Sequence, residues 1–283
     1  MATMTTPAGP DLGRAALPPA TSGRAGLAGS MRAEWTKLRS LRSTYWTLLA
    51  LVLTSVGLGT AISAASAAHL SSHPADKLNY DPTFTSLFAF VELGSLILAV
   101  LGALVITSEY STGMIRTSLT VQPRRGVLLA AKGLVFAGVA LVVALVISLA
   151  AFFLGQWMFG SVGVAATLSQ PHVLQAVVGT ALYVALVALF AFGLGAMFRN
   201  TAATITTAIA VLFVLPVIVD LLPQNWSQDI VRWLPNSAGE ALASTVGPGQ
   251  TDMFSSWGQF AVTAAYAAAA LVAGTILVRR RDA

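Results

Sequence analysis

Residues 134–154 read LVFAGVALVVALVISLAAFFL, an apolar run without a single charged side chain. A helix needs about 20 apolar residues to cross the hydrocarbon core of a bilayer, so this run is long enough to span one. It lies inside a longer segment, Gly133 to Phe198, that contains no Asp, Glu, Lys or Arg. That segment is too long for one crossing. We therefore expect two crossings, separated by an external turn marked by Gln156, Ser169, Gln170 and Pro171.

Working outward from this segment, four more stretches are apolar enough to cross a membrane. Hydrophobic residues make up 56% of the 283-residue sequence and charged residues only 10%. Soluble domains usually carry about 25% charged residues. The sequence therefore predicts an all-α integral membrane protein with six transmembrane helices, at about 45–66, 84–107, 130–154, 173–197, 202–222 and 257–278.

The basic residues predict the orientation of these helices, because Lys and Arg gather in cytoplasmic loops. Of the 16 Lys and Arg residues, all but Lys77 and Arg232 fall on one side of the predicted topology. Both termini are therefore expected in the cytoplasm. Residues 1–30, rich in Ala, Gly, Pro, Ser and Thr, are expected to form a disordered cytoplasmic tail before a transmembrane domain at 31–283. A first span cleaved as a signal near Ala64–Ala68 is the alternative.

The segment before the first span has helical periodicity. Apolar residues recur at spacings of four, three and three, and basic residues fall between them: Met31, Trp35, Leu38 and Leu41 alternate with Arg32, Lys37, Arg39 and Arg42. This pattern predicts an amphipathic helix on the membrane surface, with Trp35 at the level of the lipid headgroups. The alternative is a plain positive flank of the first span.

Several classes of site are missing from the sequence. It has no Cys, and no metal-ligand spacing surrounds His69, His73 or His172. The phosphate-binding pattern Gly-x-x-x-x-Gly-Lys-[Ser/Thr] is absent, so no cofactor and no ATPase site is expected on this chain. Although the net charge is +5, the basic residues lie in small groups between apolar runs, which argues against a nucleic-acid partner.

The segment between the second and third spans reads SEYSTGMIRTSLTVQPRRG at 108–126. Glu109 is expected at the start of a helix, where the helix dipole favours a negative charge. Ile115 and Leu119 are four residues apart and share one face, which suits a hydrophobic groove on a partner. Pro123 ends the predicted helix. An ordinary basic loop is the alternative.

Two further features are singled out. Glu92 is the one charged residue well inside a predicted span. It is therefore expected to face a subunit interface or a water-filled cavity, and it is a candidate for the transport path or gate.

The external segment 223–256 mixes Trp, apolar and acidic residues, which predicts short interfacial helices or a re-entrant pair before the last span.

The order Glu109, Gly113, Arg116, Thr117, Leu119, Pro123, Arg125, Lys132 resembles the first cytoplasmic loop of ATP-binding-cassette permeases of the second type (ABC-2). Residues 33–40, AEWTKLRS, are similar to the elbow helix that precedes the first span in that family. The resemblance covers about residues 31–283. It assigns Trp35, Lys37, Leu38 and Arg39 to the elbow helix, and it assigns coupling to an ATPase to Glu109, Gly113, Met114, Ile115, Arg116 and Leu119.

The resemblance implies a mechanism as well as a fold. Two permease copies, or close relatives, enclose a path, and each docks a separate cytoplasmic ATPase subunit that binds Mg-ATP. The expected function is export across a bacterial cell membrane of an amphipathic or hydrophobic substrate such as a drug, a peptide or a lipid-like metabolite, with multidrug or antibiotic resistance as one setting. A secondary transporter, an intramembrane enzyme and a non-transporting membrane protein are the alternatives.

Overall fold

The computed structural model describes residues 26–40, 42–121, 124–245 and 254–280, without the side chains of Arg116, Leu119 and Val121. The described part is 86% helical and contains no strand, which confirms the all-α prediction. Six of its helical segments are long and apolar enough to cross a membrane. The expected tail at 1–30 lies almost wholly outside the described residues.

Five of the six spans are longer than the apolar runs that predicted them, because their helices continue past the apolar stretch at one or both ends; the fifth, Thr201–Asp220, is one residue shorter than its predicted run at 202–222. Three are interrupted by a π-helical turn: α2 (Arg42–Val52), η1 (Leu53–Leu58) and α3 (Gly59–Ser72); α4 (Pro82–Ala89), η3 (Phe90–Gly94) and α5 (Ser95–Ser111); α9 (Thr201–Ile209), η4 (Ala210–Val214) and α10 (Leu215–Asp220). The other three are continuous: α7 (Arg125–Gly160), α8 (Val173–Phe198) and α13 (Ser256–Arg280).

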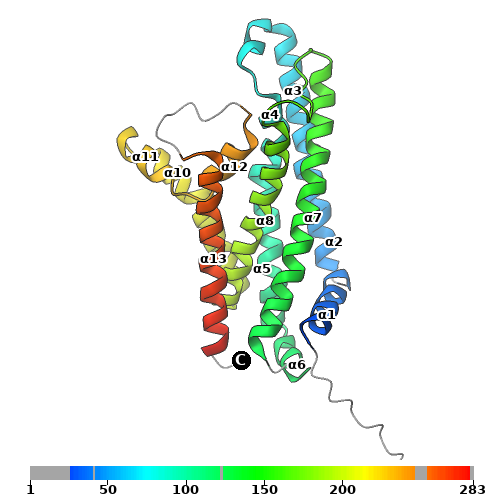
Figure 1. The fold of residues 1–283 in the computed structure, drawn as a ribbon, viewed down its shortest axis with the longest axis vertical. Helices are drawn as coiled ribbons and strands as arrows, with labels where there is room; N and C mark the ends of the chain where they lie inside the picture. Colours follow the sequence, from blue (N-terminus) through cyan, green and yellow to red (C-terminus); the bar gives the residue numbers. More distant parts are fainter. Residues whose placement is uncertain (1–25, 41, 122–123, 246–253, 281–283) are drawn as a thin grey trace, which may run out of the picture.

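Five short elements connect or flank the spans: α1 (Leu27–Ser40), the 3-10 turn η2 (Pro74–Asn79), α6 (Met114–Val121), α11 (Gln224–Val231) and α12 (Ser237–Ala243). Helices α1 and α6 lie at one end of the bundle, together with the C-terminal end of α13 (Figure 1). Of the two alternatives for the segment before the last span, the structure shows short helices, α11 and α12. Helix α12 packs on α8 and α13, whereas α11 projects sideways from the bundle (Figure 1).

Helix α8 is the centre of the bundle and packs against α5, α7 and α13. Small residues allow these close approaches. A Cβ at Gly102 in α5 would lie 2.3 Å from the backbone oxygen of Ala188 in α8. A Cβ at Gly193 in α8 would lie 2.7 Å from the backbone carbonyl carbon of Ala270 in α13. Glycine at these two positions therefore sets the distance between the central helix and two of its neighbours.

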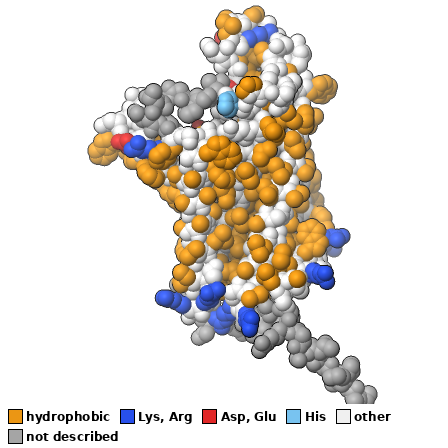
Figure 2. All heavy atoms as spheres, viewed as in Figure 1, with side chains coloured by type: hydrophobic (Ala, Val, Ile, Leu, Met, Phe, Trp, Pro, Cys, Tyr) orange, Lys and Arg blue, Asp and Glu red, His pale blue; other side chains and the backbone are white. Residues whose placement is uncertain are grey.

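The surface divides into an apolar band and a basic end. Figure 2 shows hydrophobic side chains over the middle of the bundle and Lys and Arg side chains gathered below it. We call the end that holds α1, α6 and Arg279–Arg280 the basic end, and the end that holds η2 the opposite end. The apolar band is the surface expected of helices surrounded by lipid.

One sequence expectation about the loops is wrong. Gln156 does not belong to the turn between the third and fourth spans, because α7 continues to Gly160. Its side chain is buried, donates to the carbonyl oxygen of Pro82 at 3.1 Å and to Ser86 Oγ at 3.0 Å, and accepts from the amide of Ala166 at 2.7 Å. A polar side chain with this many partners is stable inside a bundle. The turn is made by residues 161–172.

Candidate functional site

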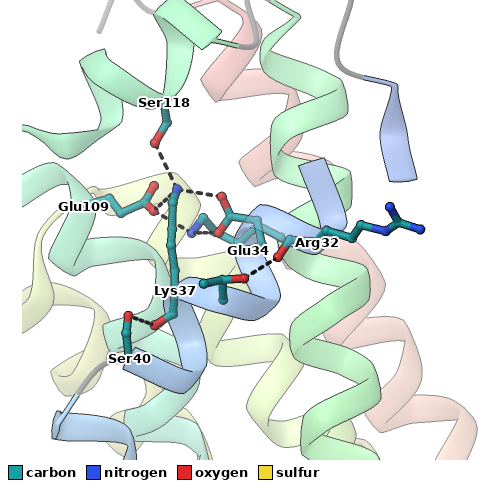
Figure 3. A network of polar contacts seen from close by, with 8 residues as sticks. Arg32, Glu34, Lys37, Ser40, Glu109 and Ser118 are labelled. Atoms are coloured by element: carbon teal, nitrogen blue, oxygen red, sulfur yellow. Dashed lines mark hydrogen bonds and ion pairs between the residues drawn. The ribbon is translucent and has the colours of Figure 1, made fainter. Parts of the chain in front are cut away.

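Four charged side chains meet inside the basic end, from three helices that are far apart in the sequence. Helix α1 contributes Glu34 and Lys37, which are one turn apart; α5 contributes Glu109 and α7 contributes Lys132. Lys132 Nζ lies 2.5 Å from Glu34 Oε2 and 2.8 Å from Glu109 Oε1. Lys37 Nζ lies 2.7 Å from Glu34 Oε1 and 3.0 Å from Glu109 Oε1. We call these four residues the charged junction; Figure 3 shows the amino group of Lys37 between the two carboxylates.

The charged junction is buried and electrically balanced. The side chains of Glu34, Lys132 and Glu109 are 3%, 6% and 7% exposed, and that of Lys37 is 29% exposed. Removing a charge from water costs several kcal/mol, and only close pairing offsets that cost. Two ammonium groups shared by two carboxylates supply such pairing. The arrangement therefore holds α1 against the ends of the second and third spans.

The electrostatics of Lys37 follow from this geometry. Partial burial lowers the pKa of Lys37, but hydrogen bonds from its amino group to Glu34 and Glu109, and the attraction of their charges, outweigh burial. The pKa of Lys37 is therefore raised above its ordinary value of 10.5. Lys37 is charged throughout the physiological pH range, so the junction keeps its balance there.

Helix α6 is attached to the charged junction through Ser118, whose hydroxyl oxygen accepts a hydrogen bond from Lys37 Nζ at 3.1 Å (Figure 3). It is attached to α5 through a turn at Thr112 and Gly113. Gly113 has φ 71°, a left-handed conformation that glycine adopts at low cost. The turn ends α5 and redirects the chain, so α6 is a separate helix at the basic end.

The expectation that Glu109 begins a helix is therefore wrong. Glu109 lies in the last turn of α5, and the following helix starts at Met114. A carboxylate near the C-terminal end of a helix is disfavoured by the helix dipole. The two ammonium groups of the charged junction offset this, since ion pairs at hydrogen-bonding distance outweigh a dipole effect of below about 1 kcal/mol.

The other residues assigned to coupling and to the elbow helix lie around the junction. On α6, Met114 is exposed and Ile115 is half-buried, while the side chains of Arg116 and Leu119 lie outside the described residues, as does Pro123. On α1, Leu38 is buried against the bundle, and Trp35 and Arg39 are exposed. The structure thus brings Lys37 and Glu109 together in one cluster, with Gly113 making the turn beside it.

Glu34 and Lys132 belong to the cluster and were not selected as site residues from the sequence alone. Lys132 carried a usable signal, because it is a charge at the mouth of an apolar run and a charge at that depth needs a partner. Glu34 carried none, because an acidic residue on a predicted surface helix is expected to face water. Its partner Lys132 is 98 positions away.

Glu92 lies apart from the charged junction. It sits in the π-helical turn η3 of the second span, about 25 Å from Glu109 along the helix at 1.5 Å per residue. Its side chain is half-buried. The turn packs beside the π-helical turn η1 of the first span, where a Cβ at Gly94 would lie 2.6 Å from Ser55 Oγ. π-Helical turns are frequent at functional sites.

The part of the chain that the structure describes contains no candidate metal site, because no group of three or more His, Asp or Glu side chains there is arranged to hold an ion.

The comparison with protein families gives one finding. The profile of a family described as "ABC-2 family transporter protein" matches residues 30–217, from α1 into η4 and α10 of the fifth span, and so includes the whole charged junction. Comparison with curated proteins gives no match.

Proposed function

The chain belongs to the ABC-2 family of transporter proteins, and on that premise we propose that it is the permease subunit of an exporter powered by a separate ATPase subunit. Family membership makes the chain a membrane component of an ABC transporter, which leaves the secondary transporter and the non-transporting protein without support. Export, the cargo and the docking of the ATPase are the parts that the proposal adds.

The observation that carries the proposal is the position of α6. This helix lies at the basic end, outside the six spans, and its residues Met114 and Ile115 present apolar side chains that are exposed or half-buried. An ATPase that docks on α6 is connected to the second span through the turn at Gly113. It is connected to α1 and to the third span through the hydrogen bond of Ser118 and the ion pairs of the charged junction. Helix α6 is therefore the coupling helix of the proposal, and α1 is its elbow helix.

The orientation follows the distribution of basic residues. The basic end carries Arg42, Arg124, Arg199 and Arg279, which favours the cytoplasmic side of a membrane. In a bacterial cell membrane this orientation puts both termini and α6 on the side where ATP is available. Mg-ATP binds to the partner subunit, and this chain takes up no nucleotide.

A second permease copy, or a close relative, completes the path in this proposal. The spans offer mostly apolar walls with scattered Ser, Thr and Gly, which suits an amphipathic or hydrophobic cargo such as a drug, a peptide or a lipid-like metabolite. Glu92 is the candidate gate residue, because it is a half-buried carboxyl at the π-helical turn of the second span.

The proposal is tested on α6. Ile115→Asp puts a charge on the apolar side of the coupling helix, and Leu119→Ala removes the second apolar anchor; losing such an anchor at an interface typically costs about 2 kcal/mol or more. Both variants are expected to lose co-purification with the ATPase and export activity. Ser111→Ala, an exposed position in the last turn of α5, is the matched control. If both α6 variants assemble and export like the parent, α6 is an ordinary loop helix and the proposal fails.

A further inference from the structure

Helix α1 has one side that packs on the bundle and one side that is exposed and basic. The buried residues recur at a spacing of four: Ser30, Glu34 and Leu38. The exposed side carries Arg32, Trp35, Thr36 and Arg39. These four are spaced by three or four residues and therefore share one face of the helix. We call them the outer face of α1.

The bundle uses most of the apolar side of α1. Leu38 is 7% exposed and belongs to the hydrophobic core, and Glu34 beside it is held in the charged junction. Trp35 stays on the outer face, where it is 48% exposed. A helix that lies on a membrane normally binds with a broad apolar face as well as a basic one. Contact of the outer face with lipid therefore depends on two arginines and one tryptophan.

The charges of these two arginines are not neutralised by the described part of the chain. The side chain of Arg32 extends away from the charged junction (Figure 3). Among the described residues, neither Arg32 nor Arg39 has an ion-pair or hydrogen-bond partner for its guanidinium. The acidic residues described at the basic end are Glu34 and Glu109, and both are buried and paired with lysines. The outer face therefore attracts anions.

The outer face lies beside the surface expected to contact lipid. Helix α1 leads into the first span, where Tyr45 and Trp46 are 59% and 71% exposed. Exposed Trp and Tyr side chains gather at the headgroup level of a membrane. In Figure 2, basic side chains lie at the lower edge of the apolar band, on the side where α1 and α2 run in Figure 1. Arg32 and Arg39 are therefore close to the level of the lipid phosphates.

We propose that the outer face of α1 binds the headgroups of anionic phospholipids in the leaflet at the basic end. The guanidinium groups of Arg32 and Arg39 each bind a phosphate, and Trp35 lies between them at the interface. Basic residues on a helix at the membrane surface select anionic over zwitterionic lipid by charge complementarity. An acidic surface of a docked ATPase is the other anion available at this end.

The leaflet is favoured over the ATPase because the outer face continues into the aromatic edge of the apolar band. Helix α6, on which the ATPase is proposed to dock, contacts α1 through Lys37, which is not on the outer face. The inference goes beyond the proposed function, and it holds for the permease alone, whether or not the chain transports a cargo.

The test measures which lipid lies next to the outer face of the full-length permease in phosphatidylcholine vesicles. Because the chain has no native cysteine, Thr36→Cys puts a single fluorophore on the outer face. Val142→Cys puts the same fluorophore on an exposed position in the middle of α7 as the control. Brominated phosphatidylglycerol and brominated phosphatidylcholine quench a fluorophore on contact, so quenching at equal mole fraction compares the affinities of the two lipids at each position.

At position 36 phosphatidylglycerol is expected to bind about 25-fold more tightly than phosphatidylcholine. Each arginine near the membrane surface contributes about fivefold, the equivalent of about 1 kcal/mol. At position 142 no preference is expected. Raising the salt from 0.1 M to 1 M shortens the Debye length from about 10 Å to about 3 Å and is expected to reduce the preference at position 36. Equal quenching by the two lipids at position 36 overturns the proposal, and protection of that position by added ATPase then assigns the outer face to the ATPase.

Variants locate the effect. Arg32→Gln and Arg39→Gln are each expected to lower the preference at position 36 about fivefold. Arg280→Gln removes the same charge from an exposed position on α13 at the same end and is expected to leave the preference unchanged. An equal fall in all three variants indicates diffuse attraction and refutes the site. If an arginine variant does not fold, the comparison of positions 36 and 142 in the otherwise unchanged chain decides alone.

Discussion

Lys132 offers the sharpest perturbation of the charged junction, because its amino group contacts both buried carboxylates. In the Lys132→Met variant the chain keeps a side chain of similar length and loses the charge. Glu34 and Glu109 then face each other with only Lys37 between them. Their side chains are 3% and 7% exposed, so water replaces the lost ammonium poorly.

The magnitude follows from these contacts. Breaking a buried ion pair by removing one partner costs about 3–5 kcal/mol, because the other charge stays buried without compensation. The double variant Lys132→Met with Glu109→Gln removes one charge of each sign and keeps the pair of Glu34 and Lys37 at 2.7 Å. We expect the second substitution to recover about 0.5–3 kcal/mol, the range of coupling energies between residues in contact.

The assay is equilibrium unfolding of the purified permease in mixed micelles, with the helical signal followed as denaturing detergent is added. Lys37→Met is the control, with a smaller loss expected because Lys37 is 29% exposed and Lys132 still pairs both carboxylates. Since the pKa of Lys37 is raised above 10.5, its contribution is fully present below that pH and is lost only as the pH rises further. If Lys132→Met is as stable as the parent, or if the two substitutions in the double variant are additive, the four residues are not an energetic unit.

Three further predictions concern other parts of the molecule. With no native cysteine to interfere, a cysteine at Ser161 is expected to react with an impermeant thiol reagent in intact cells and one at Thr112 only after permeabilisation; labelling of position 112 in intact cells contradicts the orientation. Glu92→Gln is expected to lower export without lowering expression, and unchanged export removes that carboxyl from the path. Gly102→Ala is expected to cost about 1–3 kcal/mol of stability by overpacking α5 on α8, whereas Gly138→Ala, with nothing within 4 Å of its added Cβ, is expected to be neutral; equal thermal stability of the two variants contradicts the packing argument.

The fold was predictable from the sequence because each span is an apolar run of membrane length, and length is what a bilayer selects. The ends of the spans were less predictable. Helix α7 begins at Arg125, before the apolar run, and ends at Gly160, after it, because backbone hydrogen bonds continue the helix outside the hydrocarbon. Gln156 looked like a loop residue for the same reason. Only the positions of its partners on α4 and in the following turn make a buried amide acceptable there.

The charged junction was predictable only in part. Local patterns and the family motif singled out Lys37, Glu109 and Gly113, because periodicity and motif spacing are local properties; the turn that Gly113 makes between α5 and α6 was not predicted. The partners of a buried charge depend on which helices become neighbours, and single-sequence periodicity does not contain that information. Glu109 illustrates the error: taken locally, it suits the start of a helix, but the charges of Lys37 and Lys132 make the end of α5 the stable position.

The contacts of α6 indicate which helices a force from a docked ATPase would displace first. Its hydrogen bond to the junction runs from the charged amino group of Lys37 to the hydroxyl of Ser118, and one such bond contributes about 1.5–3 kcal/mol. Its link to α5 is covalent and two residues long, through Thr112 and Gly113. A force from a docked ATPase therefore acts first on the second span, whose last turn carries Glu109. Because Glu109 is paired with Lys37 of α1 and Lys132 of α7, displacing it alone separates buried charges at the cost worked out above. The less costly motion carries the elbow helix and the third span along with the second, so the charged junction makes three helices respond to one contact.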